Sequence, residues 1–357
     1  MTVCFFGYPN ESYSRSKILI DGLKKNGVQV VSCTDKTGSF PFRYWRLVKK
    51  FWPLHQKIDV IFVQFPGHLN TPIAWFLGKV FKKIVVFDVF ISLYETYIFD
   101  RQVASPQSLT AKFYWWVDKL SCLLADKVTL DTYAHINYFV TEFHLPRKKF
   151  VRIPVGGDET LFRPSLKAKS SKLKAKIIVE FHGMFTRIHG AEVFVQAAKK
   201  LENNPHLEFW LIGDSPNYRL PIDLYKQLKP KTMKYWSRLP VKKLAQKISQ
   251  ADISVGHLGP TKKARVLLTN KMFHALASRL ALIAGDNQAS QELLENKTNC
   301  LFVRMYDEKD LARKIIYLAK NSKLRHRLAE SGFKLHQKEF SNRKLGSLFK
   351  ELLLKTV

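Results

Sequence analysis

Apolar and polar positions follow two alternating patterns along this chain. Short apolar runs predict buried strands, and longer segments with an apolar residue at every third or fourth position predict helices. The alternation runs from Thr2 to Val155 and starts again at Ile177. It predicts parallel sheets joined by crossover helices. The predicted strands are Thr2–Phe6, Val28–Cys33, Val60–Phe65, Ile84–Asp88, Lys127–Asp131, Phe150–Val155, Ile177–Phe181, Leu207–Ile212, Met233–Trp236, Ile253–Leu258 and Leu280–Ala284.

The predicted helices lie between these strands in the sequence, or follow the last of them. Most show one apolar stripe, as a helix that covers a sheet does. The predicted helices are Ser14–Lys25, Arg43–Trp52, Thr71–Phe81, Leu109–Leu124, Tyr133–Phe143, Gly190–Leu201, Val241–Ser249, Asp307–Ala319, Leu324–Phe340 and a short amphipathic helix from Arg343.

A break in composition divides the chain. The segment LKAKSSKLKAK, Leu166–Lys176, has no apolar face and is typical of a linker. We therefore predict an α/β protein of two Rossmann-like, doubly wound parallel-sheet domains that face each other across a cleft. The predicted parts are an N-terminal domain at 1–163, a linker at 164–176, a second domain at 177–340, and a C-terminal helix at 341–357 whose pattern allows it to pack back on the first domain.

Charge and composition narrow the class of protein. The net charge is +30, of which residues 161–357 carry +22. Such a field attracts nucleic acid, an anionic membrane surface or phosphorylated substrates, and does not choose among them. A hydrophobic content of 46% excludes a largely disordered chain. The four cysteines form no C-x-x-C pair, so neither a zinc site nor a disulfide scaffold is indicated; they are Cys4, Cys33, Cys122 and Cys300.

The most informative chemistry lies between Ala251 and Val303. An apolar run is followed by a basic loop with Lys262, Lys263 and Arg265, then by a Thr-Asn-Lys helix start, and then by a second apolar run. This order predicts cations and a helix N-terminus at the carboxyl edge of a parallel sheet, where a diphosphate fits. Glycines predict three loops at the same edge. Gly183 and Gly190 bracket the first loop, where backbone N–H groups would approach a phosphate. Gly213-Asp214 and Gly285-Asp286 each mark a turn after a strand.

An ordered set of sequence segments resembles a known protein family. FHG(x)6G, LIGD, ADIS-x-G, TNKMF-x-ALA, GD-x-x-A-x-x-ELL and NCLFV, with FDVFISLYET-x4-DR, LDTYAHINYF and IPVGGDETLF before them, resemble GT-B retaining glycosyltransferases of family 4, the glycosyl transferases group 1, over nearly the whole chain. The resemblance implies a nucleotide-sugar donor domain at 177–340 and an acceptor domain at 1–163.

The chain departs from this family at four positions. Val266 and His274 stand where the E-x7-E motif has glutamates, and Met184 and His189 stand where the first glycine loop commonly has Arg and Lys. Other cations must then hold a diphosphate, and Lys271 is the first candidate because a Lys in the first turn of a helix is unfavourable without an anion. His274 would hydrogen-bond a ribose hydroxyl in place of the motif's Glu, or is a plain surface His. The predicted donor and phosphate ligands are Gly183, Arg187, Gly190, Gly213, Asp214, Lys263, Arg265, Asn270, Lys271, His274 and Glu292.

In the N-terminal domain, His68 and Asp88 directly follow apolar strands, so we expect them to face the cleft. The resemblance implies acceptor or sugar contacts for them, and the predicted catalytic set is His68, Asp88 and Lys271. It also implies that positioned cations stabilise the departing diphosphate, without a paired acid and base. We expect no cofactor besides the donor substrate and no metal, because the sequence has no Asp-x-Asp or His cluster.

One predicted helix is both basic and aromatic. In RYWRLVKKFWP, Tyr44, Leu47, Val48, Phe51 and Trp52 share one face, and basic residues lie opposite. This pattern is typical of a membrane-surface helix, and equally of a crossover helix that packs on its sheet. The predicted membrane contacts are Arg43, Arg46, Lys49, Lys50, Trp45 and Trp52. No apolar run is long enough to span a bilayer, and no signal peptide is evident, so we expect a cytoplasmic protein, peripheral on the inner face of the cell membrane.

Together these features predict a metal-independent hexosyltransferase that moves a sugar from a nucleoside-diphosphate donor to a hydroxyl acceptor, a sugar or a lipid-linked molecule, in the synthesis of cell-surface glycans or glycolipids. The first alternative is a catalytically silent nucleotide-sugar-binding or scaffold protein, suggested by Met184, His189, Val266 and His274. A sugar-nucleotide epimerase explains the N-terminal segments less well. A nucleic-acid-binding protein rests on net charge alone, so no nucleic-acid partner is expected.

Overall fold

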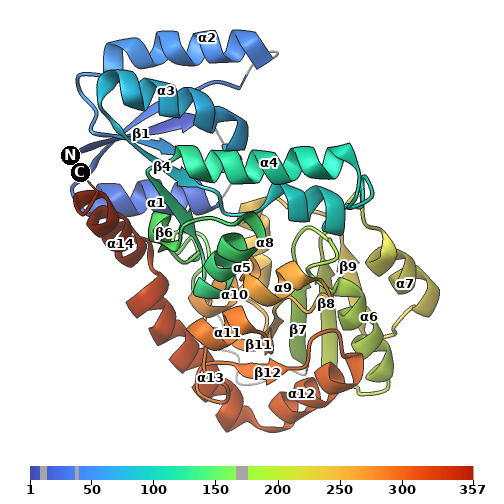
Figure 1. Cartoon of the computed structure of the whole chain (residues 1–357). Coiled ribbons are helices and arrows are strands. Elements are labelled where there is room, and N and C mark those ends of the chain that lie inside the picture. Colours follow the sequence, from blue (N-terminus) through green and yellow to red (C-terminus); the bar gives the residue numbers. More distant parts are fainter. Residues whose placement is uncertain (9–13, 37–39, 166–175, 357) are drawn as a thin grey trace. The chain divides into compact units, whose positions relative to one another are not determined.

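The computed structural model describes residues 1–8, 14–36, 40–165 and 176–356, and it has the predicted α/β fold (Figure 1). Twelve strands form two six-stranded sheets in which every pair is parallel. The chain divides into one compact unit of residues 1–154 with 342–357 and a second of residues 155–341. The predicted linker lies almost entirely outside the described residues, and the predicted roles of the domains in binding acceptor and donor stay predictions.

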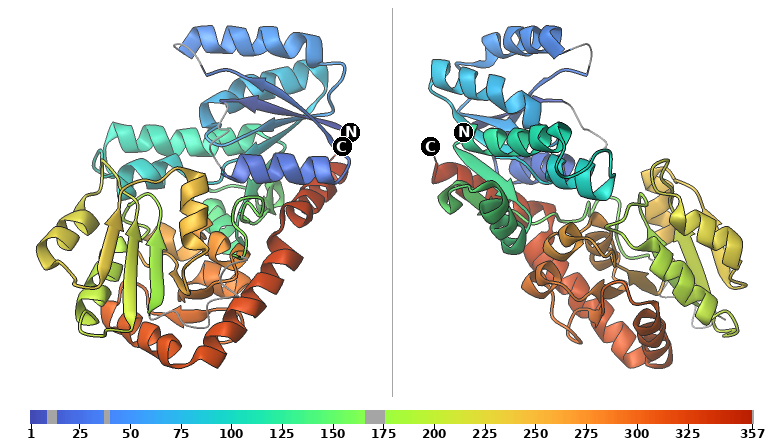
Figure 2. Two further views of the ribbon diagram at one scale, coloured as in Figure 1. Left: turned by 180° about the vertical axis from the view of Figure 1, so that it is seen from behind. Right: turned by 45° about the vertical axis from the view of Figure 1, so that its right-hand side comes forward.

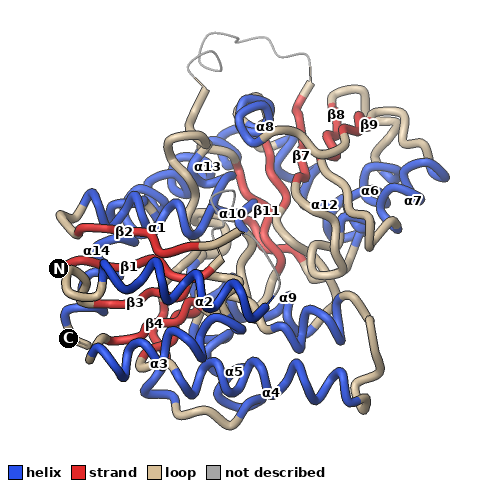
Figure 3. Tube along the Cα trace, turned by 90° about the horizontal axis from the view of Figure 1, so that it is seen from above, coloured by secondary structure: helices blue, strands red, loops and turns tan. Residues whose placement is uncertain are grey.

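The first unit contains a sheet of order β2-β1-β3-β4-β5-β6. Apolar side chains of α2 to α5 pack on one face of this sheet, and those of α1 and α14 pack on the other. The tube in Figure 3 shows β2, β1, β3 and β4 of this sheet side by side. Its elements are β1 (Thr2–Gly7), α1 (Ser14–Lys25), β2 (Gln29–Thr34), α2 (Phe40–Phe51), η1 (Trp52–Leu54), β3 (Val60–Val63), η2 (His68–Asn70), α3 (Thr71–Phe81), β4 (Ile84–Asp88), the π-helical η3 (Glu95–Asp100), α4 (Leu109–Leu124), β5 (Lys127–Leu130), α5 (Tyr133–Phe143), η4 (Arg147–Lys149), β6 (Phe150–Arg152) and α14 (Asn342–Leu354).

Helix α14 lies against α1 because glycines let the two backbones touch. A Cβ added to Gly22 would lie 2.2 Å from the carbonyl oxygen of Asn342, and one added to Gly346 would lie 2.1 Å from the backbone of Gly22. The aromatic ring of Phe349 then packs on Phe62, at 4.7 Å between ring centroids. The C-terminal helix is thereby part of the first unit's core.

The second unit contains a sheet of order β12-β11-β10-β7-β8-β9. Helices α6, α7 and α12 contribute to the apolar core with its strands, and α10 lies against β10 and β11. Its elements are β7 (Ile177–His182), α6 (Ala191–Lys200), β8 (Leu207–Ile212), α7 (Leu220–Leu228), β9 (Met233–Trp236), α8 (Val241–Ile248), β10 (Ile253–Val255), α9 (Lys262–Val266), α10 (Asn270–Ala277), β11 (Ala281–Gly285), α11 (Gln288–Leu293), β12 (Leu301–Val303), α12 (Glu308–Lys320), α13 (Ser322–Leu335) and the π-helical η6 (His336–Phe340).

Two local predictions are wrong. The basic segment expected to be a loop contains the helix α9, which Thr261 caps by accepting a hydrogen bond from the backbone N–H of Ala264. The strand expected at Ile253–Leu258 ends at Val255, because the chain turns at Gly256 and the side chain of His257 bonds the carbonyl oxygen of Ala264. Within the described residues, no helix has the length and apolar character needed to cross a membrane.

Candidate functional site

Two glycine loops meet at the carboxyl edge of the second sheet. Gly183 follows β7 with φ of +133°, and Gly213 follows β8 with φ of +138°. A Cβ at Gly213 would lie 1.9 Å from the carbonyl oxygen of Gly183, so no other residue fits there without moving the loop. The N–H of Gly183 donates to the carbonyl oxygen of Ile212 and that of Gly213 to Trp236. The N–H of Gly183 is therefore used by the sheet, and the predicted approach of a phosphate to the loop between Gly183 and Gly190 stays a prediction.

The side chain of Lys271 is buried beside these loops. Lys271 lies in the first turn of α10 and is 3% exposed. Its Nζ has no hydrogen-bond partner among the described residues and lies 3.6 Å from the centroid of the Phe181 ring. A Cβ added to Gly183 would lie 3.6 Å from this Nζ, so the amine reaches the end of β7. Burial holds the pKa of Lys271 well below its usual value, although the carboxylate of Glu180 acts in the opposite direction.

A row of polar side chains joins Glu180 to His274. The Nδ1 of His182 lies 2.9 Å from a carboxylate oxygen of Glu180, and its Nε2 lies 3.1 Å from Nδ1 of His274. The hydroxyl of Ser254 donates to the other oxygen of Glu180. The ring of His274 stacks on Phe162 at 3.6 Å. Burial lowers the pKa of His274, and so do the nearby His182, His336 and Lys271, so this imidazole is neutral.

Further basic groups surround Lys271. The Nδ1 of His189 lies 3.1 Å from the hydroxyl of Thr186. Burial lowers the pKa of His189, and the positive charges of Lys271 and Lys263 lower it further. Lys263 itself is 4% exposed in α9. Lys263 of α9 and Lys271 of α10 therefore both lie near the imidazole of His189.

The other predicted ligands are spread over several elements of the second unit. Burial raises the pKa of the Glu192 carboxylate, and the positive charge of Arg187 opposes this shift. The same carboxylate accepts a hydrogen bond from the hydroxyl of Tyr218. Gly190 precedes α6 and packs on the backbone of Leu258 and Gly259. The remaining predicted ligands are Asp214 after Gly213, the exposed Arg265 in α9, Asn270 at the start of α10 and the partly exposed Glu292 in α11.

Asp88 and His68 of the first unit are both buried. The guanidinium of Arg15 donates to both carboxylate oxygens of Asp88 at 2.9–3.0 Å, and Thr129 donates to it at 2.7 Å. The Nε2 of His68 lies 3.1 Å from a carboxylate oxygen of Asp118. Both groups thus hold the first unit together, and their predicted contacts with substrate stay predictions.

Two basic side chains of α2 form hydrogen bonds within the first unit. Arg46 donates to Asp35 at 2.6 Å, and Lys50 donates to the carbonyl oxygen of Thr34. Phe51 is buried, as a helix packed on its sheet requires, whereas Trp45 and Trp52 are 63% and 61% exposed. The helix therefore covers its sheet and also presents aromatic side chains outward.

Sequence reasoning missed Glu180, His182 and Ser254. A signal was present, because Glu180 and His182 are two residues apart in an otherwise apolar strand, and residues two apart lie on one face. A charged residue at a buried strand position indicates a specific partner. Here the partner of the pair is His274, 92 residues further along the chain.

Part of the chain matches the model of a known protein family. Residues 175–321 match the family model described as Glycosyl transferases group 1. No curated protein matches the chain.

Solved structures match over nearly the whole chain. HepE from Anabaena in complex with UDP-glucose has a TM-score of 0.76 at 14% identity, over 99% of this chain and 100% of that one. Sucrose-phosphate synthase from Thermosynechococcus elongatus has a TM-score of 0.72 at 17% identity, over 99% and 98%. A glycosyltransferase from Rickettsia africae has a TM-score of 0.70 at 15% identity, over 99% and 98%. These likenesses confirm the GT-B fold.

Proposed function

We propose that the protein is a retaining glycosyltransferase that uses a nucleoside-diphosphate-sugar, because residues 175–321 match the glycosyl transferases group 1 family and the chain has the GT-B fold. The observation that carries this proposal is the buried Nζ of Lys271, which has no hydrogen-bond partner among the described residues. A buried amine costs free energy unless an anion accompanies it. The diphosphate of the donor is the anion that we assign to it.

The amine of Lys271 would act on the leaving group. During transfer the bond between the sugar's anomeric carbon and the diphosphate breaks, a bond to the acceptor oxygen forms on the same face, and the acceptor hydroxyl passes its proton to the departing diphosphate. Negative charge then grows on the diphosphate, and a fixed cation stabilises it more in the transition state than in the ground state. Because Lys271 and Lys263 supply positive charge, we propose that no metal ion is needed.

The row from Glu180 to His274 would position the nucleotide. Glu180 orients His182, and His182 in turn fixes the ring of His274 against Phe162. A neutral imidazole held in this way can hydrogen-bond a ribose hydroxyl through its Nε2, which has no partner among the described residues. His274 thus takes the role that the resemblance gives to a Glu of the E-x7-E motif.

The structures of HepE with UDP and with UDP-glucose make UDP the first nucleotide to test. We propose that the acceptor is the hydroxyl of a sugar or lipid-linked molecule, and that the protein works as a peripheral protein at the cytoplasmic membrane face.

Binding and turnover of the full chain test this function. Melting temperatures with UDP, GDP, ADP, CMP and their sugar conjugates should show a selective rise, since a ligand at 100 times its Kd stabilises by about 2.7 kcal/mol. Lys271→Met keeps the length of the side chain without its charge and should weaken nucleotide binding. The matched control is Lys243→Met, which removes an exposed lysine of α8. Equal nucleotide affinity in both variants would refute the assignment of Lys271.

A catalytically silent nucleotide-sugar-binding protein is the second candidate. It is favoured by Met184, which is 56% exposed at a position where the resemblance leads us to expect a cation. Release of nucleoside diphosphate from a sugar nucleotide, followed by NMR of the anomeric proton, separates the two. Turnover with retained configuration supports transfer, and binding without turnover supports the silent protein.

A further inference from the structure

Helices α2, α3 and α4 of the first unit, with the short η1 that follows α2, expose most of its aromatic surface. The chain has seven tryptophans, all described, and the four exposed ones lie in this layer. Trp45 is in α2, Trp52 in η1, Trp75 in α3 and Trp116 in α4, with exposed fractions of 37–63%. Four exposed tryptophans on one layer are unusual, because a soluble domain rarely shows a large apolar patch without a partner.

More apolar side chains surround the tryptophans, and α2, α3 and α4 expose no acid. Helices α2 and α3 contain no Asp or Glu, and the one acid of α4, Asp118, is buried, accepting hydrogen bonds from the backbone N–H of Leu93 and Tyr94. We call this surface the aromatic–basic face. Its exposed apolar members besides the tryptophans are Phe42, Phe76, Val80, Phe113, Leu120 and Leu123.

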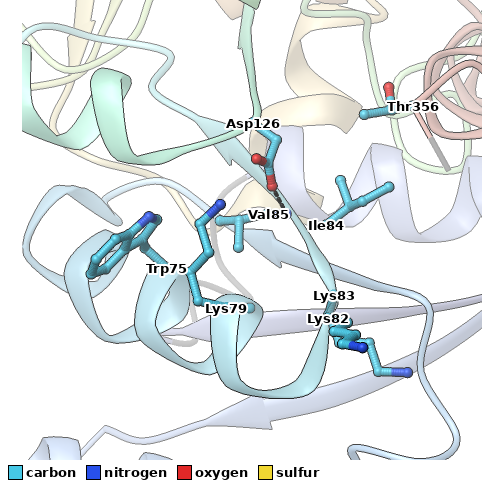
Figure 4. Close-up of a pocket in the computed structure, with 9 residues that line it drawn as sticks. Trp75, Lys79, Lys82, Lys83, Ile84, Val85, Asp126 and Thr356 are labelled. Atoms are coloured by element: carbon cyan, nitrogen blue, oxygen red, sulfur yellow. Dashed lines mark hydrogen bonds between the residues drawn. The ribbon is translucent and has the colours of Figure 1, made fainter.

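Basic side chains stand among these aromatic rings. The Nζ of Lys49 lies 5.3 Å from the ring centroid of Trp45, and the Nζ of Lys119 lies 5.4 Å from that of Trp116. At the end of α3, a hollow of about 400 Å³ is lined by Trp75 together with three lysines, Lys79, Lys82 and Lys83 (Figure 4). The hollow also contains Asp126, whose carboxylate accepts the backbone N–H of Val85. The face therefore combines rings and ammonium groups with little opposing charge.

The fold itself does not need these exposed groups. The inner sides of the helices already pack on the sheet through residues such as Leu47, Leu77 and Cys122. The helices are also held to one another, since Phe51 of α2 contacts Phe81 of α3 at 5.7 Å between ring centroids. Figures 1 and 2 show α2, α3 and α4 in one layer on the same sheet. The outward residues thus form a surface available for a partner.

We propose that the aromatic–basic face docks this protein on an anionic lipid bilayer. Tryptophan and phenylalanine rings favour the boundary between headgroups and acyl chains, and nearby lysines bind headgroup phosphates. The face carries both groups and exposes no acid on its three helices, which matches an anionic bilayer in charge and in polarity. The inference deepens the peripheral location proposed above and needs no sugar transfer to be true.

Vesicle binding by the full chain tests the inference without any sugar nucleotide. We expect the protein to sediment with vesicles of phosphatidylcholine and phosphatidylglycerol, and far less with vesicles of phosphatidylcholine alone. Lys79→Gln, Lys82→Gln and Lys112→Gln together should lower the partition coefficient roughly 100-fold, since each lysine near an anionic leaflet contributes about a factor of five. All three lysines are exposed.

Matched controls in the second unit remove the same charge and the same kind of ring. Binding should survive a triple change of the exposed Lys242, Lys243 and Lys309 to Gln. Trp116→Ser should weaken binding, whereas Tyr317→Ser, which removes a ring 45% exposed, should not. Equal losses in the two lysine triples would reduce the effect to net charge and overturn the proposal. Absence of vesicle binding would overturn it too, as would a dimer of the wild-type chain that Trp116→Ser dissociates. None of these outcomes bears on whether sugar is transferred.

Discussion

Acidification should destabilise the second unit through His336. This residue begins the π-helical turn η6 and is 1% exposed. Its ring lies against Gly157, where an added Cβ would come within 3.1 Å of Nε2. Burial lowers the pKa of His336 to about 4 from its ordinary value of 6.5, although the charge of Glu159 opposes the shift. The folded protein therefore holds this imidazole neutral at a pH where the unfolded chain binds a proton.

The sign and the size of the effect follow from this difference. The contribution of the neutral His336 to the free energy of unfolding is present above pH 6.5. It is lost as the pH drops from 6.5 towards 4, because the unfolded state takes up the proton first. At 1.36 kcal/mol per unit of pKa, the full loss from this residue is about 3.4 kcal/mol, and about 2 kcal/mol of it is lost between pH 7.5 and pH 5. His274, whose pKa is also lowered by burial, adds a loss of the same sign.

Urea unfolding at pH 7.5 and pH 5 measures the effect when the wild type is compared with His336→Gln. The difference between the two proteins isolates this residue, because all other titrating groups are shared. The variant should lose about 2 kcal/mol less stability over this interval. His206→Gln is the matched control, since it removes an exposed imidazole of the same unit. An identical pH dependence in wild type and His336→Gln would refute the reasoning.

Three further outcomes are expected. Asp88→Ala leaves the guanidinium of Arg15 buried without its carboxylate, so the free energy of unfolding should fall by about 3–5 kcal/mol in urea titrations; unchanged stability would show that the pair is not structural. Binding of a nucleoside diphosphate should take up protons, because an anion beside Lys271 raises a pKa that burial has lowered, and calorimetry in buffers of different ionisation enthalpy measures this uptake. Gly346→Ala forces a Cβ into the backbone of Gly22 and should cost about 1–3 kcal/mol, visible as a lower melting temperature with no change in the aromatic–basic face.

Local pattern predicted the long elements well. Helices α1, α3, α4 and α5 and strands β4, β8 and β9 have the predicted bounds. Each has a continuous apolar stripe or run, and the packing of that stripe on a sheet decides where the element lies. Short elements were lost for the opposite reason: the five residues of α9 are too few to show a helical period, so their charges suggested a loop. Helix α7 was missed altogether.

The site was predictable only as far as its residues are close in sequence. The basic residues of α9 and α10 follow one strand, so their gathering at one sheet edge could be inferred. The partner of Asp88, by contrast, is Arg15, 73 residues earlier, and nothing in the local pattern of α1 marks that arginine as buried. Pairings of this kind are decided by the folded chain, which is why Asp88 looked open to a substrate.

The return of α14 to the first unit fixes an order of assembly during synthesis. Residues 155–341 form a unit that is continuous in sequence, whereas the first unit needs residues 342–357 as well. Until the ribosome has released α14, the apolar face that contains Phe5 and Phe62 lacks the helix that covers it. Domains commonly fold from the N-terminus onward as they emerge. Here the unit that begins first is completed last, and its uncovered face is the surface that a chaperone would meet on the nascent chain.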